Sequence, residues 1–270
     1  MKLNVSHKTV YRFEEMIRGV VQSHRLVPTD CENQRVLEWT VHVEGSEVGA
    51  GFRDGAGDWV QTVSLRREVA GLCVEVSGEV ETQDLSGVLK GHRESVHPAV
   101  YLRPSRATAP SRAIRQMAEA AVEGEGAILA KAHALSRTVA ETVEYRPGET
   151  EASTTAAEAL EHGYGVCQDH AQILISAAIA SEIPARYVAG YLYSESGEEM
   201  AEASHAWAEL YVAGLGWVGF DPSNECCPDE RYIRLGSGFD ATDAAPIRGV
   251  AHGETTEHLD VEVSVGQVQQ

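Results

Sequence analysis

The chain has 270 residues, enough for one large domain or two of ordinary size, and its 43% hydrophobic and 23% charged residues are typical of a soluble globular protein. Its formal net charge of −19 argues against binding to nucleic acid or to anionic membranes, because both need clustered Lys and Arg. We expect neither a transmembrane helix nor a signal peptide, since no run of about 18 apolar residues occurs and the first residues alternate between polar and apolar.

The first hundred residues are predicted to be rich in β-strands. Residues 36–43 place apolar side chains at every second position, and residues 58–65 and 72–80 repeat this pattern. The glycine-rich segment 53–59 is typical of a turn between two of these strands. The pattern predicts an antiparallel β-sandwich or a similar module.

Composition changes near residues 98–112, where three prolines interrupt the periodicity, and this indicates a domain junction. We therefore predict a β-rich domain over 1–100 and a second domain over 101–270. The predicted helices of the second domain cover 111–124, 127–145, 153–163 and an apolar stretch within 165–180. Its predicted strands cover 185–193, 205–212, 216–222 and 258–265.

The five cysteines, at positions 31, 73, 167, 226 and 227, are an odd set without a repeated CxxC spacing. This pattern favours neither a zinc site nor a disulfide framework, and it fits a protein of the reducing cytoplasm. Cys31 and Cys73 are predicted to be small buried hydrophobic residues. The adjacent pair Cys226 and Cys227 is assigned no role.

Cys167 stands out because it lies between a glycine turn at Gly165 and the predicted start of an apolar helix. Unpaired backbone N–H groups and the positive end of the helix dipole stabilise a thiolate there, and the thiolate is the nucleophilic form. The same donors can receive a developing oxyanion. We expect only the backbone N–H of Cys167 to act in this way.

A base must accept the proton of the thiol, and His205 is the best placed of the 11 histidines because it opens a predicted strand. Asp221 ends the next strand. If the intervening hairpin loop has an odd length, as with Ala213–Leu215, Asp221 lies opposite Trp207 and His205 is its diagonal neighbour on the same face. The predicted triad is Cys167 as nucleophile, His205 as acid and base, and Asp221 as the group that orients the imidazole.

Several segments resemble the bacterial transglutaminase-like family. The core is represented by "GVCQDHA", "IPARYVAGYL" and "ASHAWAELYVAGLGWVGFDPSN", the N-terminal region by "SHKTVYRF", "SHRLVPTDCENQRVLEWTVHV" and "FRDGAGDWV", and the C-terminal segment by "GFDATDAAPIRGVAHG". The resemblance covers nearly the whole chain. It implies an α+β fold with a papain-like transglutaminase core, in which the helix bearing the cysteine packs on an antiparallel sheet, preceded by a β-sandwich-like domain. The family's triad falls on Cys167, His205 and Asp221.

The sequence departs from the family pattern at two positions near the thiol. His170 stands where members often have Phe, and Gln172 stands where they often have His. We expect His170 to face solvent and Tyr164, beside the turn, to pack against its neighbours.

These features predict a thiol-dependent acyl-transfer enzyme, most simply a cysteine peptidase or amidase acting through a thioester on a peptide or protein amide. Hydrolysis is preferred because indiscriminate crosslinking would harm a cell. One alternative is a protein-glutamine gamma-glutamyltransferase that passes the acyl group to a lysine amine, and another is a binding scaffold without catalysis. We expect no cofactor and no metal, because the spacing of His162, Cys167, Asp169 and His170 matches no zinc pattern. The substrate and the oligomeric state are left open.

Overall fold

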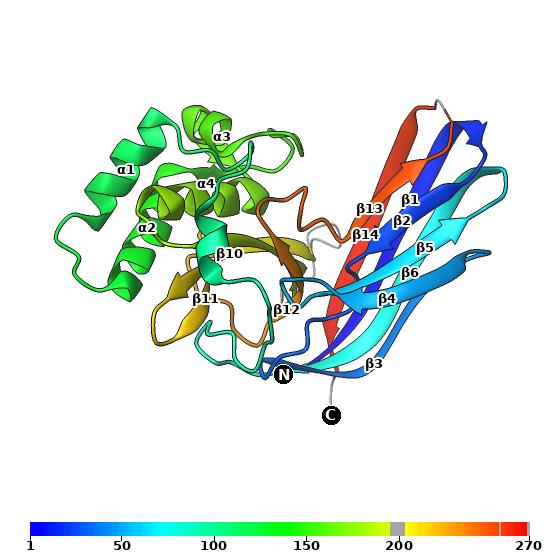
Figure 1. The fold of residues 1–270 in the computed structure, drawn as a ribbon, viewed down its shortest axis with the longest axis horizontal. Helices are drawn as coiled ribbons and strands as arrows, with labels where there is room; N and C mark the ends of the chain where they lie inside the picture. The colour runs from blue at the N-terminus through cyan, green and yellow to red at the C-terminus, as the bar shows by residue number, and fades with distance from the viewer. Residues whose placement is uncertain (195–202, 254, 269–270) are drawn as a thin grey trace.

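The computed structural model describes residues 1–194, 203–253 and 255–268, which form a β-sandwich beside a second sheet covered by helices (Figure 1). The strands of the sandwich are β1 (Lys2–Ile17), β2 (Val20–His24), β3 (Gln34–Val43), β4 (Glu47–Arg53), β5 (Trp59–Leu65), β6 (Val69–Thr82), β13 (Ile247–Ala251) and β14 (Glu257–Gln267). The remaining elements are the 3-10 helix η1 (Pro98–Leu102), α1 (Arg112–Val122), α2 (Ile128–Thr142), β7 (Glu144–Tyr145), α3 (Ala156–His162), β8 (Tyr164–Gly165), α4 (Cys167–Ala180), β9 (Ala185–Leu192), β10 (Ser204–Val212), β11 (Gly216–Phe220) and β12 (Tyr232–Gly238).

The sandwich consists of two four-stranded sheets, ordered β14-β1-β6-β3 and β13-β2-β5-β4. Alternating apolar side chains of β1 and β6 meet those of β2 and β5 in a shared core, which includes Val74 and Val76 from one sheet and Val63 and Leu65 from the other. The predicted β-rich module is therefore confirmed, because the three strands expected from periodicity correspond to β3, β5 and β6.

The sandwich takes one outer strand for each sheet from the end of the chain. β14 pairs with β1 along 11 successive positions, and β13 pairs with β2 from Ile247↔His24 to Ala251↔Val20. The predicted second domain of 101–270 thus differs from the structure at its end, because β13 and β14 complete the sheets of the first module. Periodicity identified the strand over 258–265 but not its partner, which lies about 250 residues away. The boundary near residue 100 stays a prediction.

The second part is α4 packed on the antiparallel sheet β11-β10-β9-β12, with α1, α2 and α3 around the helix (Figure 1). α4 is apolar on nearly all sides, and Ile173, Leu174 and Ile175 are fully buried. The preceding α3 is fixed by a capping box between Thr155 and Glu158 and by a left-handed Gly163. The expected α+β core, a cysteine-bearing helix on an antiparallel sheet, is confirmed.

A buried ionic network joins the sandwich module to this sheet. Arg186 of β9 binds Glu209 at 2.7 Å and Glu94 at 2.6 Å, while Arg234 of β12 binds Glu209 at 2.9 Å and Asp58 at 2.6 Å. Glu94 and Asp58 belong to the N-terminal hundred residues, whereas the arginines and Glu209 belong to the sheet. Each module therefore buries charged groups whose partners come from the other module.

Two buried histidines in the sandwich predict how its stability depends on pH. His7 lies between Tyr191 and Thr9, and burial lowers its pKa to about 4; burial also lowers the pKa of His24 to about 4. These values lie below the unfolded value of about 6.5, so the contribution of each neutral histidine is present above pH 6.5 and is lost as the pH falls toward 4. We expect the free energy of unfolding to drop by about 2 kcal/mol per histidine between pH 7 and pH 5.

Urea unfolding at a series of pH values measures this drop. In His7→Gln we expect the slope between pH 7 and pH 5 to decrease, whereas His258→Gln, at an exposed position, should leave it unchanged. An unchanged slope in His7→Gln would contradict the assignment.

Candidate active site

The thiol of Cys167 is held at the first turn of α4, as predicted. The Asp169 carboxylate accepts hydrogen bonds from the Val166 N–H at 2.9 Å and from the Thr150 hydroxyl at 2.7 Å, which fixes the entry to the helix. Gly165 is required here, because a Cβ at this position would meet the Asp169 side chain at 2.6 Å. Cys167 itself is partly buried, and its N–H lies among the helix donors that have no intrahelical acceptor.

The hairpin between β10 and β11 brings His205 and Asp221 together. Val212 pairs with Gly216, so the loop holds three residues, Ala213–Leu215, and the condition of an odd length is met. Gly214 has a φ of 88°, the left-handed conformation that such a loop needs. With this register His205 Nε2 lies 2.6 Å from Asp221 Oδ2, and both side chains are largely buried.

Asp221 is surrounded by donors that sequence reasoning missed. Oδ1 accepts from the backbone N–H of Ser223 at 3.0 Å and from its hydroxyl at 2.6 Å. Oδ2 accepts from the Asn224 amide at 2.7 Å and from the Tyr232 hydroxyl at 2.8 Å, besides His205. Burial by itself would raise the pKa of Asp221, but the hydrogen bond and charge of His205 and the other donors outweigh it and lower the pKa to about 2.

The segment "DPSN" carries a usable signal for two of these donors, because an Asp followed closely by Ser and Asn is typical of side chains that bind the backbone of their own turn. Tyr232 carries no such signal, since it reaches Asp221 from β12.

The imidazole of His205 has two hydrogen-bond partners in the candidate triad. It is hydrogen-bonded to Cys167 as well as to Asp221, which binds the ring at Nε2. Burial would lower the pKa of His205, yet these two hydrogen bonds and the two negative charges raise it to about 10. A protonated imidazole in this position can pass its proton to a leaving group.

Two aromatic rings fix the plane of this imidazole. The Trp207 ring is stacked at 6.5 Å between centroids, and the Tyr232 ring lies edge-on at 5.8 Å. Trp207 follows His205 by two residues in the same strand, and because side chains alternate along a strand, the two lie on the same face of the sheet.

The expectation that His170 faces solvent is wrong. The side chain is buried at 2% exposure, with Nδ1 3.0 Å from the Val166 carbonyl oxygen and Nε2 3.0 Å from that of Val143. It therefore ties the end of α2 to the start of α4, a role that depends on packing between helices. Tyr164 packs as expected, stacked on His162 and covered by the Arg146 guanidinium.

The remaining cysteines differ from their predictions in detail. Cys31 and Cys73 are partly exposed rather than fully buried. Cys226 lies 3.3 Å from the Tyr232 hydroxyl, so it contacts a residue that binds Asp221.

Among the residues described, no group of three or more His, Cys, Asp or Glu side chains is arranged to hold a metal ion. None of the described helices is long and apolar enough to cross a membrane.

Comparison with known proteins follows the two structural modules. Residues 3–81 match the bacterial transglutaminase-like N-terminal region, and residues 115–222 match the transglutaminase-like superfamily. An uncharacterised protein of Mycobacterium leprae is 28% identical over 98% of both chains, and one of Mycobacterium tuberculosis is 26% identical over 99% of this chain and 92% of its own. The crystal structure of "a Putative Cysteine Protease from Cytophaga hutchinsonii" has a TM-score of 0.76 and 22% identity, covering 100% of this chain and 92% of the other, and shares the fold.

Proposed function

Because the chain belongs to the transglutaminase-like superfamily, we propose that it is a thiol-dependent acyl-transfer enzyme that hydrolyses amide bonds of peptides or proteins. One observation supports this most strongly: the His205 ring binds Asp221 at 2.6 Å and is also hydrogen-bonded to Cys167. The three groups come from α4, β10 and the residue after β11, so their convergence requires the whole core. The transglutaminase-like fold supports a protein or peptide substrate.

In the proposed reaction the Cys167 thiolate attacks the amide carbonyl carbon, and the negative charge moves to the carbonyl oxygen next to the Cys167 N–H. The His205 imidazolium donates its proton to the leaving nitrogen, the C–N bond breaks, and a thioester and a free amine result. Neutral His205 then takes a proton from water, whose oxygen attacks the thioester. The acid is released as the sulfur regains its thiolate form, and Asp221 keeps the imidazole oriented throughout.

Labelled peptides incubated with the protein, with and without a primary amine, test hydrolysis against transfer. We expect cleavage to exceed incorporation of the amine and to be lost in Cys167→Ala. Incorporation that outpaces cleavage would instead make the protein a transglutaminase, the second candidate.

Alkylation tests the scaffold alternative. We expect Cys167 to react at neutral pH much faster than Cys73, a partly exposed thiol whose pKa is raised by burial and by the charge of Glu75. Equal rates would favour a protein that binds partners without catalysis.

All five thiols are unpaired, which supports our proposal that the protein works in a reducing compartment such as the cytoplasm.

Tyr232→Phe removes one hydrogen bond to the Asp221 carboxylate and leaves the ring in place. We expect kcat/KM to fall about tenfold through kcat, since a hydrogen bond to a charged group contributes about 1.5 kcal/mol. Steady-state kinetics measures the change. Tyr191→Phe is the matched control, because its hydroxyl binds His7 in the sandwich, and it should leave kcat unchanged. Equal kcat in wild type and Tyr232→Phe would contradict a positioning role.

A further inference from the structure

His170 lies between two backbone carbonyl groups, and both of its ring nitrogens meet an acceptor. Nδ1 is 3.0 Å from the Val166 carbonyl oxygen, and Nε2 is 3.0 Å from the Val143 carbonyl oxygen. Because a carbonyl oxygen can only accept a hydrogen bond, each ring nitrogen has to donate in order to satisfy its contact. A neutral imidazole has one N–H group, whereas an imidazolium has two. The two contacts together therefore indicate a protonated ring.

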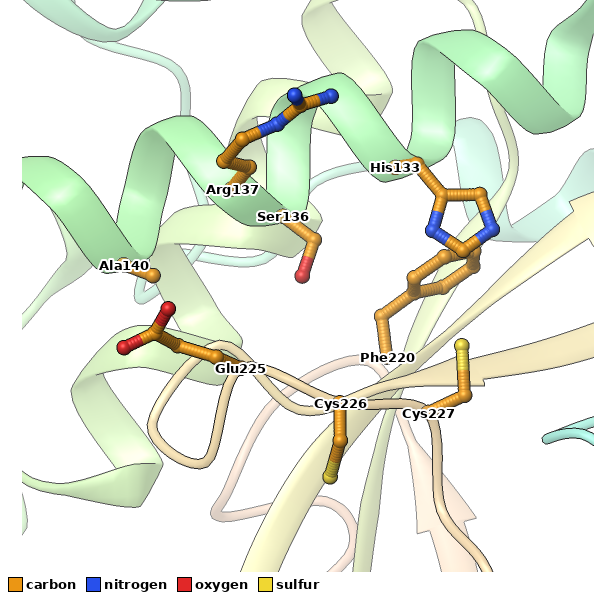
Figure 2. A pocket seen from close by; sticks show the side chains of 8 residues that line it. All are labelled: His133, Ser136, Arg137, Ala140, Phe220, Glu225, Cys226 and Cys227. Carbon is orange, nitrogen blue, oxygen red and sulfur yellow. The ribbon is translucent and has the colours of Figure 1, made fainter.

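One of these carbonyl groups belongs to the negative end of a helix. Val143 is the C-cap of α2, and the last carbonyl groups of a helix lack intrahelical donors and carry a negative partial charge. The last turn of α2 has no basic residue that could compensate this charge. Arg137 lies earlier in the helix, where it lines a groove of about 500 Å³, and Figure 2 shows its guanidinium directed back toward His133 and away from this end. The ring of His170 is thus placed where a cation is favoured.

The other carbonyl group is accompanied by a buried carboxylate. Asp169 accepts a hydrogen bond from the N–H of Val166 at 2.9 Å, on the same residue whose carbonyl oxygen contacts His170. The Oδ1 atom of Asp169 is buried and has no hydrogen-bond partner among the residues described. A buried negative charge that hydrogen bonds satisfy only in part is stabilised by a cation close to it. A neutral ring at position 170 would leave this carboxylate with less compensation.

The titratable groups that meet the ring from α4 and β7 have only neutral or negative forms. Cys167 lies in the same turn of α4 as Asp169, and the Tyr145 ring of β7 lies 6.2 Å from the imidazole between centroids. Glu144, next to Val143 in the chain, is exposed and paired with Arg146. The positive end of the α4 dipole acts against a charged ring, while the end of α2 acts in its favour.

The contact with Val166 connects the ring to the chemistry of the site. The Val166 carbonyl group and the Cys167 N–H belong to one planar peptide unit, so a donor bound to the oxygen also fixes the direction of the N–H. The same hydrogen bond polarises the unit and makes its N–H a stronger donor. This N–H is the group expected to receive the oxyanion. A positive charge in the first turn of α4 also favours the thiolate form of Cys167.

We propose that His170 is held as an imidazolium and acts as a positioning residue, which orients the Cys167 N–H toward the oxyanion and favours the Cys167 thiolate. The catalytic part rests on the proposed function, whereas the charge of the ring does not. His170 stands where members of the family often have Phe, which supplies neither a donor nor a charge.

The ring nitrogens report the charge directly. In the nuclear magnetic resonance spectrum of nitrogen-15-labelled protein at pH 7.5, we expect both ring nitrogens of His170 to be protonated. Their signals are assigned by their loss in His170→Phe or His170→Asn. His7 is the control and should be neutral, because burial lowers its pKa to about 4. One protonated and one unprotonated nitrogen in His170 would overturn the proposal.

Two substitutions separate the charge of the ring from its hydrogen bond. His170→Phe removes both, and His170→Asn keeps a neutral N–H donor near the place of Nδ1. Because both remove the charge, we expect alkylation of Cys167 at neutral pH to slow about three- to tenfold in each, the effect of one charge across several ångströms of partly buried protein. We expect kcat to fall about tenfold in His170→Phe, less than the loss of a whole oxyanion donor, and by a smaller factor in His170→Asn, with KM unchanged. His258→Asn, at an exposed position on β14, is the control and should change neither rate.

Unchanged alkylation and unchanged kcat in His170→Phe would contradict the positioning role. If alkylation responds but no turnover that depends on Cys167 is found, the proposed function fails, while the effect of His170 on the thiol is retained. The ring nitrogen signals come from the folded wild type, so they decide the charge even if one of the variants does not fold.

Discussion

Asp221→Asn will lower kcat/KM by about three to four orders of magnitude while the protein remains folded. The carboxylate orients the His205 ring through a 2.6 Å hydrogen bond and supplies one of the two negative charges that raise the pKa of this histidine to about 10. An amide at this position supplies neither charge nor a second strong acceptor. Its NH2 group would also face donors from Asn224 and Tyr232. Steady-state kinetics from pH 5 to pH 10, with circular dichroism as the check on folding, measures the effect.

The same substitution should change two pH profiles. The imidazolium is the proton donor, so the alkaline limb of kcat/KM should move to lower pH as the pKa of His205 falls. In the wild type the raised pKa contributes stability that is present below about pH 6.5 and lost as the pH rises toward 10, and this loss should shrink in the variant. Asp260→Asn, at an exposed position on β14, is the control. A loss of less than tenfold would contradict the proposed triad.

Asp58→Ala will lower the free energy of unfolding by about 3–5 kcal/mol, because it removes one partner of a buried ion pair and leaves the other charged. Asp58 is fully buried and binds the Arg234 guanidinium at 2.6 Å, and its second oxygen accepts from the N–H of Ser237 at 2.7 Å. Burial alone would raise the pKa of Asp58, yet the charges of Arg234 and Arg186 keep it below its usual value.

Urea unfolding of Asp58→Ala and of a control variant, Glu81→Ala, shows whether burial or contact distance decides the cost of losing an ion pair. Arg35 and Glu81 also approach to 2.6 Å, but both side chains are more than half exposed. Glu81→Ala should therefore cost less than about 1 kcal/mol. A similar loss of unfolding free energy in the two variants would contradict a special contribution of the buried network.

The sequence was most informative where a local rule decided the outcome. A glycine turn before an apolar helix was enough to place Cys167 at a helix start. An odd hairpin loop was enough to put His205 and Asp221 on one face, because side chains alternate along a strand. Strand periodicity identified β3, β5 and β6 for the same reason.

Features that depend on distant packing were not predictable in this way. Nothing near His170 indicates that two helix ends would enclose it, and nothing near Arg186 or Arg234 distinguishes them from surface arginines. Tyr232 reaches Asp221 only because β12 pairs with β9 in the sheet. Each of these contacts joins elements whose neighbours are set by topology, which a single sequence does not state.

The origin of the outer strands of the sandwich has a consequence for biosynthesis. During translation the residues of β1 and β2 leave the ribosome first, but their edges stay uncovered until residues 247–267 have been made. The helices and sheet that carry the thiol can assemble in the interval, since domains generally fold in order of synthesis. A nascent chain stalled before residue 247 would therefore expose two open strand edges, which makes it a candidate for chaperone binding.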